Sequence, residues 1–69
     1  MEGELQLRLG ANIRKRREEL GLSQEALAHR LNVHRTYYSS IERGERNLSL
    51  RSVERLAAGL GVAPLELLR

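Results

Sequence analysis

The sequence predicts an all-α domain, a compact bundle of five short helices. Three observations favour this fold class. Apolar residues recur at helical spacing in five segments. Each of the first four segments is followed by a residue that tolerates a left-handed backbone, namely Gly21, Asn32, Gly44 and Gly61. No segment shows the alternation of apolar and polar residues that is typical of a strand. The expected helices span residues 4–20, 24–31, 35–43, 50–60 and 64–68 of a single domain, 1–69.

The expected helix starts and inner faces support these boundaries. Ser23 and Ser49 precede the second and fourth helices, where a hydroxyl accepts from a free amide of the first turn, and Pro64 suits the first position of the last helix. Gly10 lies inside the first helix and costs about 1 kcal/mol relative to Ala, which close packing would explain. The inner faces of the first and fourth helices are expected to comprise Leu5, Leu9, Ile13 and Leu20, and Val53, Leu56, Ala57 and Leu60.

Length and composition limit what the chain can be. A chain of 69 residues buries only about 60% of its unfolded surface, so its fold is only marginally stable by itself. Because it has no cysteine, neither a disulfide nor a thiolate metal site can stabilise it. Oligomerisation is the remaining way to stabilise the fold. No apolar run or signal peptide points to a membrane or to export, which predicts a cytoplasmic, nucleoid-associated protein.

The charge favours a polyanionic partner. Lys+Arg 12 against Asp+Glu 9 gives a net charge of +3, and all but one of the basic residues are arginines, whose forked donors suit phosphates and guanine edges. A GC-rich coding sequence or adaptation to heat would explain the arginine excess equally well. The aromatic content of 3% disfavours a protein that stacks the bases of single strands.

Residues 23–43 carry the most informative pattern of the chain. They predict two short amphipathic helices that meet at a tight corner at Asn32, with small Ala28 where the helices come close. This arrangement is typical of a DNA-binding helix-turn-helix, whose second helix enters the major groove. The apolar positions that define the pattern are Leu27, Leu31, Val33, Tyr38 and Ile41.

Two charged residues fall on inward-facing positions. Arg17 continues the spacing of the apolar residues in the first helix, and Glu42 lies one turn after Tyr38 and beside Ile41. An unpaired charge on a packed face is costly, so Arg17 and Glu42 are expected to pair across the two helices. The alternative is that both side chains extend into solvent.

Four segments resemble the Xre/Cro-type helix-turn-helix family of phage and bacterial repressors. They are Ile13-Arg14-x-x-Arg17, Gly21-Leu22-Ser23-Gln24-x-x-Leu27-Ala28, Ile41-Glu42-Arg43-Gly44 and Leu56-Ala57-x-x-Leu60-Gly61-Val62. Residues 35–49 are especially similar to the controller proteins of restriction–modification systems, although prophage and antitoxin regulators share such strings. The resemblance implies a lambda-repressor-like fold, a homodimer, and double-stranded DNA as the partner.

The resemblance also implies roles for individual residues, with Arg17 and Glu42 as a structural ion pair. Positions that match base-reading residues of the family are His34, Arg35, Thr36, Tyr37, Ser40 and Arg46. Positions that match phosphate contacts are Ser23, Gln24, Ser39, Arg43 and Asn47.

The residue chemistry ranks these candidates. Arg35 is the strongest base reader, because a guanidinium can bond both acceptors of guanine. Tyr37 is expected to face outward, since Tyr38 and Ile41 define the inner face. Ser40 contacts a base or only lets the helix approach closely, and Gln24 contacts a phosphate or braces the recognition helix.

The C-terminal segment is expected to complete the core and to dimerise. Val62, Leu65 and Leu68 are too many apolar groups for so short a helix to hide alone. A two-fold axis would place two recognition helices about 34–36 Å apart, so the expected operator is an inverted repeat with half-sites one helical turn apart.

Other functional classes are disfavoured. His29 and His34 lie on different helices without a third metal ligand nearby, and no Gly-rich phosphate loop or nucleophile motif is present. We therefore expect no enzyme activity, metal, cofactor or small-molecule ligand. The rival interpretations are an antitoxin or prophage-type repressor and a protein-interaction module without DNA binding. The absence of any acid from Val33 to Ile41 argues against the interaction module.

Overall fold

The computed structural model describes residues 3–69, so the first two residues of the predicted domain lie outside it. The all-helical class is as predicted, but the fifth helix is not an α-helix. A segment of five residues that starts at a proline has few hydrogen bonds to form, and the tighter 3-10 geometry suits such short pieces. The elements are α1 (Glu4–Glu19), α2 (Gln24–Leu31), α3 (Arg35–Glu42), α4 (Leu50–Leu60) and the 3-10 helix η1 (Pro64–Leu68).

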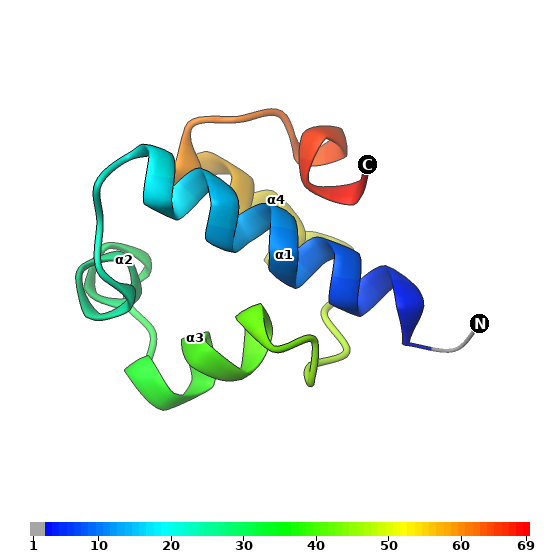
Figure 1. The fold of residues 1–69 in the computed structure, drawn as a ribbon, viewed down its shortest axis with the longest axis horizontal. Coiled ribbons are helices and arrows are strands. Elements are labelled where there is room, and N and C mark those ends of the chain that lie inside the picture. The colour runs from blue at the N-terminus through cyan, green and yellow to red at the C-terminus, as the bar shows by residue number, and fades with distance from the viewer. Residues whose placement is uncertain (1–2) are drawn as a thin grey trace.

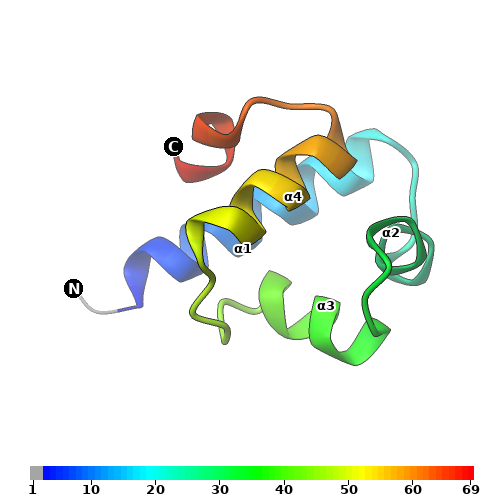
Figure 2. The same ribbon diagram turned by 180° about the vertical axis from the view of Figure 1, so that it is seen from behind.

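Helix α1 is the centre of the arrangement. It contacts α3, α4 and η1, while α2 contacts α3 and α4. Figures 1 and 2 show α1 and α4 side by side, with α2 and α3 together on one side of this pair and η1 on the other. One surface of α3 therefore faces away from the rest of the molecule.

The helix ends form as their residue types predict. The hydroxyls of Ser23 and Ser49 accept from the amides of Ala26 and Ser52. Asn32 has φ 58°, in the left-handed region, and ends α2 at the corner before α3. The corner thus fixes the angle at which α3 leaves α2.

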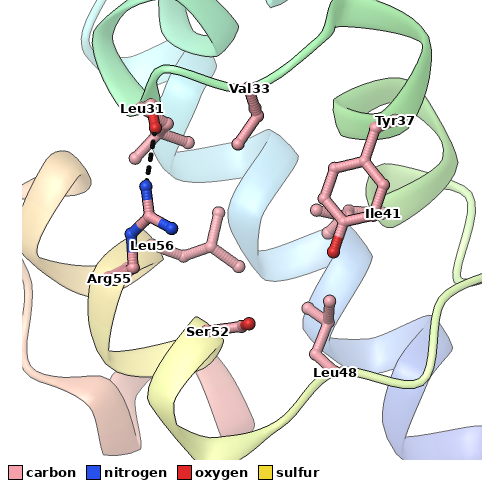
Figure 3. A pocket seen from close by; sticks show the side chains of 8 residues that line it. All are labelled: Leu31, Val33, Tyr37, Ile41, Leu48, Ser52, Arg55 and Leu56. Carbon is pink, nitrogen blue, oxygen red and sulfur yellow. Dashed lines mark hydrogen bonds between the residues drawn. The ribbon is translucent and has the colours of Figure 1, made fainter.

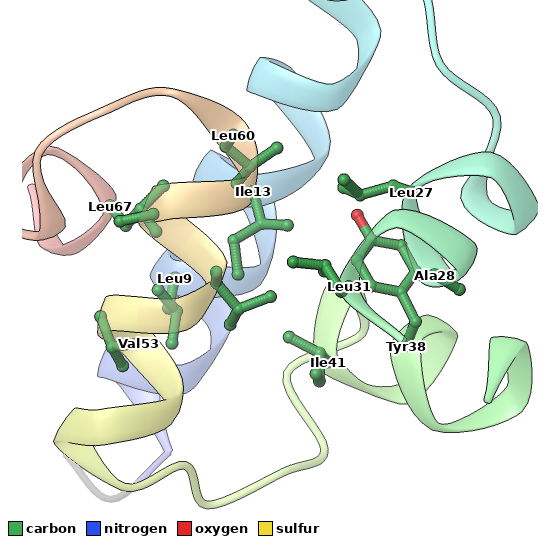
Figure 4. Close-up of a cluster of buried hydrophobic side chains, with 12 residues drawn as sticks. Leu9, Ile13, Leu27, Ala28, Leu31, Tyr38, Ile41, Val53, Leu60 and Leu67 are labelled. Atoms are coloured by element: carbon green, nitrogen blue, oxygen red, sulfur yellow. The ribbon is translucent and has the colours of Figure 1, made fainter. Parts of the chain in front are cut away.

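The core lies where α1, α2, α3 and α4 meet (Figure 4). Two residues of the inner face expected for the first helix are exposed instead, Leu5 at 58% and Leu20 at 37%. Leu5 lies in the first turn of α1, and Leu20 directly follows its last residue. Both are at the ends of the helix rather than along its packed middle, where Leu9 and Ile13 are buried. The largest fully buried side chains are Tyr38, Ile13, Leu27, Leu60 and Leu67.

Gly10 marks the point where α1 and α3 approach most closely. A Cβ atom there would lie 2.5 Å from the carbonyl oxygen of Glu42 and 2.6 Å from that of Ile41. Only glycine allows the backbone of α3 to come this near to α1. This contact holds the C-terminal end of α3 against α1 and places Glu42 beside Arg17.

Candidate DNA-binding surface

The predicted pair of Arg17 and Glu42 is present at the junction of α1 and α3. The guanidinium of Arg17 donates to both carboxylate oxygens, at 2.6 Å to Oε2 and 3.2 Å to Oε1. The two side chains are 12% and 4% exposed, so water competes little with this two-pronged bond. Arg17 also donates to the carbonyl of Leu22, which ties the start of the helix-turn-helix to the same site.

Two further donors complete the surroundings of Glu42. The Tyr38 hydroxyl donates to Oε2, and Gln24 Nε2 donates to Oε1 at 2.9 Å. Burial raises the pKa of Glu42, but the hydrogen bonds from Arg17, Tyr38 and Gln24 outweigh burial and hold it below its ordinary value. Burial and the bond to the carboxylate raise the pKa of Tyr38. The carboxylate is therefore ionised, and one group joins α1, α2 and α3.

Gln24 extends this network to the outer side of α3. Its Oε1 accepts from the Ser39 hydroxyl at 2.7 Å. Of the two roles expected for Gln24, the bracing role is thus built into the fold. Sequence reasoning missed the partnership with Ser39, because neither residue interrupts an apolar spacing as Arg17 and Glu42 do.

The exposed surface of α3 brings several predicted DNA contacts together. Arg35, Ser39 and Arg43 follow one another at intervals of one helical turn, and Thr36 lies beside them. Arg35 and Thr36 are exposed, and Arg35 has no ion pair or side-chain hydrogen bond with any residue from 3 to 69. The guanidinium at the start of the helix is free to meet a ligand.

His34 serves as the cap of α3. Its Nδ1 accepts from the amide of Thr36 at 3.1 Å, so the imidazole is exposed but one nitrogen is used within the helix. Only Nε2 remains for a partner. Ser23 is likewise a cap, and its hydroxyl is engaged with Ala26 at the start of α2.

Two of the residues expected to contact bases do not lie on the exposed surface of α3. Figure 3 shows the Tyr37 ring turned toward Ile41 and Leu48 rather than outward, where it lines a hollow between α3 and α4. Ser40 is only 5% exposed, and its hydroxyl donates to the carbonyl of Tyr37. The reason is the segment after α3, which folds back over this side of the helix.

Arg46 is what covers these two residues. Its Nε donates to the Ser40 hydroxyl at 2.7 Å, and its guanidinium lies 5.0 Å from the centre of the Tyr37 ring. Arg46 itself is exposed, so its other N–H groups face solvent. Nearby, Arg43 pairs with Glu45 on the surface at 3.1 Å, and Asn47 is exposed.

Two of the three residues expected at a dimer interface line different hollows. Val62 lines a polar hollow with Asn12 and Arg16, whereas Leu68 lines an apolar hollow with Leu5 and Leu50. Leu65 is 75% exposed. The residue of this segment that completes the core is Leu67, at 2% exposure, which sequence reasoning did not single out.

Within residues 3–69, no three histidine, cysteine or carboxylate side chains gather as metal ligands. No helix of that part of the chain is both long and apolar enough to cross a bilayer.

Comparison with known proteins agrees with this geometry. The family model described as helix-turn-helix, HTH_3, matches residues 13–67. The chain belongs to this family. The match includes α2, the Asn32 corner and α3, and it extends through α4 into η1.

Individual relatives of this helix-turn-helix chain cover nearly its full length. Control protein C.MunI from Mycoplasma sp is 46% identical over 65 residues, which are 93% of this chain and 88% of the relative. The structure of hypothetical transcription factor NHTF from Neisseria covers 100% of this chain and 79% of its own, with 42% identity and a TM-score of 0.91. The restriction–modification controller protein C.Esp1396I, solved as a tetramer with its 35 base-pair operator, is 38% identical with a TM-score of 0.81 and covers 96% of this chain and 97% of its own.

Proposed function

We propose that this chain is a sequence-specific regulator of transcription that binds double-stranded DNA, as a controller protein of a restriction–modification system does. The observation that carries the proposal is the contrast within α3. Its inner charge is fully engaged, whereas Arg35 on its outer surface has no partner among the described residues. The similarity to C.MunI and to the operator-bound C.Esp1396I supports the same function.

The division of labour follows from the chemistry of each group. Arg35 bonds guanine through its two-pronged guanidinium, while the exposed Thr36 lies beside it and offers a methyl and a hydroxyl. Arg43, Arg46 and Asn47 surround the exit from α3, where they contact phosphates or a groove edge. The free amides at the start of α2 attract a phosphate. Residues 1–69 act as one domain in the cytoplasm, in contact with the nucleoid.

The proposed regulator is a homodimer. An apolar hollow lined by Leu5, Leu50 and Leu68 lies where the starts of α1 and α4 meet the end of the chain. Leu50 is 78% exposed, and Leu65 on the same terminal segment is 75% exposed. A second copy that covers this hollow would remove Leu5, Leu50 and Leu68 from water and double the DNA contacts.

Selection from random duplex DNA tests the DNA-binding function. We expect an enriched inverted repeat that shifts the protein in a gel, with affinity falling as salt is raised because phosphate contacts release counterions. Failure to enrich any sequence, with equal binding to all duplexes, would refute the proposal.

Sedimentation tests the dimer. The wild type is expected to sediment as a dimer at micromolar concentration, and Leu50→Glu as a folded monomer with weaker operator binding. Leu20→Glu is the matched control, because Leu20 is an exposed leucine at the opposite end of α1. A wild-type monomer that protects a single half-site would contradict the dimer.

A further inference from the structure

In the hydrogen-bond network around Glu42, each donor and each acceptor is determined by the chemistry of the groups. An ionised carboxylate can only accept hydrogen bonds, and Glu42 accepts from Arg17, Tyr38 and Gln24. Of the two ends of the Gln24 amide, only the nitrogen can donate. The Nε2 end must therefore face Glu42, as it does at 2.9 Å.

This orientation determines the next bond. With Nε2 turned to Glu42, the Oε1 of Gln24 faces the Ser39 hydroxyl at 2.7 Å. An amide oxygen only accepts, and a serine hydroxyl has a single proton. The proton of Ser39 is therefore committed to Gln24, and the outward side of its oxygen carries lone pairs alone.

We propose that Ser39 is a specificity-determining residue that reads an exocyclic amino group, N6 of adenine or N4 of cytosine, in the major groove. The inference rests on the proposed DNA-binding function. Ser39 is partly exposed and lies one turn from both Arg35 and Arg43, on the same side of α3 as these two exposed arginines. The amino groups of adenine and cytosine are the donors that the major groove presents, and an oxygen restricted to accepting suits them alone.

The same restriction excludes the role that resemblance assigns to Ser39. A phosphate oxygen is an acceptor and needs a donor, which Ser39 does not have while Gln24 holds its proton. Gln24 is thus a positioning residue that acts through Ser39. The neighbouring hydroxyls differ, because that of Ser40 donates to the carbonyl of Tyr37 and that of Thr36 has no partner among residues 3–69.

Base analogues test directly whether the Ser39 oxygen accepts a hydrogen bond from a base. The first step is to select an operator with the wild type and to find the base pair at which Ser39→Ala loses its preference. The adenine there is then replaced by purine, or the cytosine by 2-pyrimidinone, either of which lacks only the amino group. We expect the wild type to bind this duplex about three- to ten-fold more weakly, the range of one neutral hydrogen bond. Ser39→Ala should bind both duplexes equally.

Two controls separate the orientation of Ser39 from its mere presence. Gln24→Ala frees the hydroxyl to rotate and to donate, so removal of the amino group should cost that variant less than it costs the wild type. Thr36→Val removes a neighbouring hydroxyl of the same surface. It should weaken binding to both duplexes by the same factor, so the ratio of the two affinities should equal that of the wild type. Thermal unfolding of each variant verifies that it is folded.

The outcomes separate a failure of the proposed DNA-binding function from a failure of the role of Ser39. If the wild type selects no sequence, both the proposed function and the role of Ser39 are refuted. If an operator is found but Ser39→Ala weakens all sequences equally, Ser39 is a phosphate contact and the inference is wrong. It is equally wrong if the wild type binds the duplex without the amino group as tightly as the natural one.

Discussion

The two ends of α3 are built in opposite ways. At its C-terminal end, Glu42 is 4% exposed and accepts from three side chains on three helices, and Gly10 lets the backbone touch α1. At its N-terminal end, Arg35 is exposed and has no partner among the described residues. The imidazole of His34 caps this end by accepting from the amide of Thr36. One end is anchored to the fold and the other is left for a ligand.

This difference shows how a small domain can hold α3 in place mainly through residues on its inner side. A bundle of 69 residues has few core contacts to spare, so a polar network takes over part of the positioning. Such a network is effective only when every member is satisfied. Within residues 3–69, no buried side-chain nitrogen or oxygen lacks a hydrogen-bond partner.

The largest expected effect comes from breaking the anchored end. Glu42→Ala leaves Arg17, Tyr38 and Gln24 without their acceptor, and loss of one member of a buried pair costs about 3–5 kcal/mol. We expect chemical denaturation to show a loss of this size in the free energy of unfolding. Glu45→Ala removes the partner of Arg43 on the surface and should leave the free energy of unfolding almost unchanged, because water screens an exposed ion pair. Equal effects of the two substitutions would contradict the contrast between the two environments.

The next effect tests the backbone contact at the same end. Gly10→Ala forces a methyl group against two carbonyl oxygens of α3, and such overpacking typically costs about 1–3 kcal/mol. Gly59→Ala is the matched control, because its methyl group would meet the Leu31 side chain, at 2.4 Å from Cδ2 and 3.5 Å from Cγ, and no backbone atom of another element. A Gly10→Ala protein as stable as the wild type in thermal unfolding would show that α3 can move away from α1 without cost.

The anchored end was largely predictable from the sequence. Arg17 and Glu42 interrupt apolar spacings, so their pairing followed from the cost of burying a lone charge. Asn32, Ser23 and Ser49 were predictable because each residue type matches the backbone or amide that it serves. These are local rules, and they hold before any tertiary contact is known.

The flank of α3 was harder to predict, because it depends on tertiary contacts. The orientation of Tyr37 and the burial of Ser40 depend on how the segment after α3 folds back and brings Arg46 over them. Similarly, the 3-10 geometry of η1 decides that Leu67 and not Leu65 enters the core. Periodicity assigned for an α-helix could not make that choice.

Arginines that cap helix ends were also missed. Arg55 donates to the carbonyl of Leu31 at 3.0 Å, and Arg16 donates to that of Leu60 at 3.0 Å. Leu31 and Leu60 are the last residues of α2 and α4, whose carbonyls lack partners within the helix. The sequence shows where a helix ends and therefore which carbonyls lack partners within it. It does not show which distant arginine donates to them.

At the free end of α3, the expected effect is on binding rather than on folding. Arg35→Ala should weaken operator binding by about 1–3 kcal/mol and relax the preference at one position per half-site. Arg43→Ala should weaken binding to all DNA sequences alike. It should also reduce by about 1 the slope of log affinity against log salt concentration. Competition binding with operator variants at two salt concentrations separates the two. Unchanged specificity in Arg35→Ala would mean that this end does not read bases.

The smallest expected effect is on the pH dependence of stability. The hydrogen bonds to Glu42 hold its folded-state pKa below the ordinary glutamate value of about 4.3, so the folded protein releases this proton more readily than the unfolded chain does. The stability from this shift is fully present above that value and is lost as pH falls through the folded-state pKa. Glu42→Gln has no such group. Its unfolding free energy should therefore decline less steeply below about pH 4 than that of the wild type, in denaturation curves measured from pH 6 to pH 3. Parallel declines would mean that the carboxylate at the anchored end is no better satisfied than one in water.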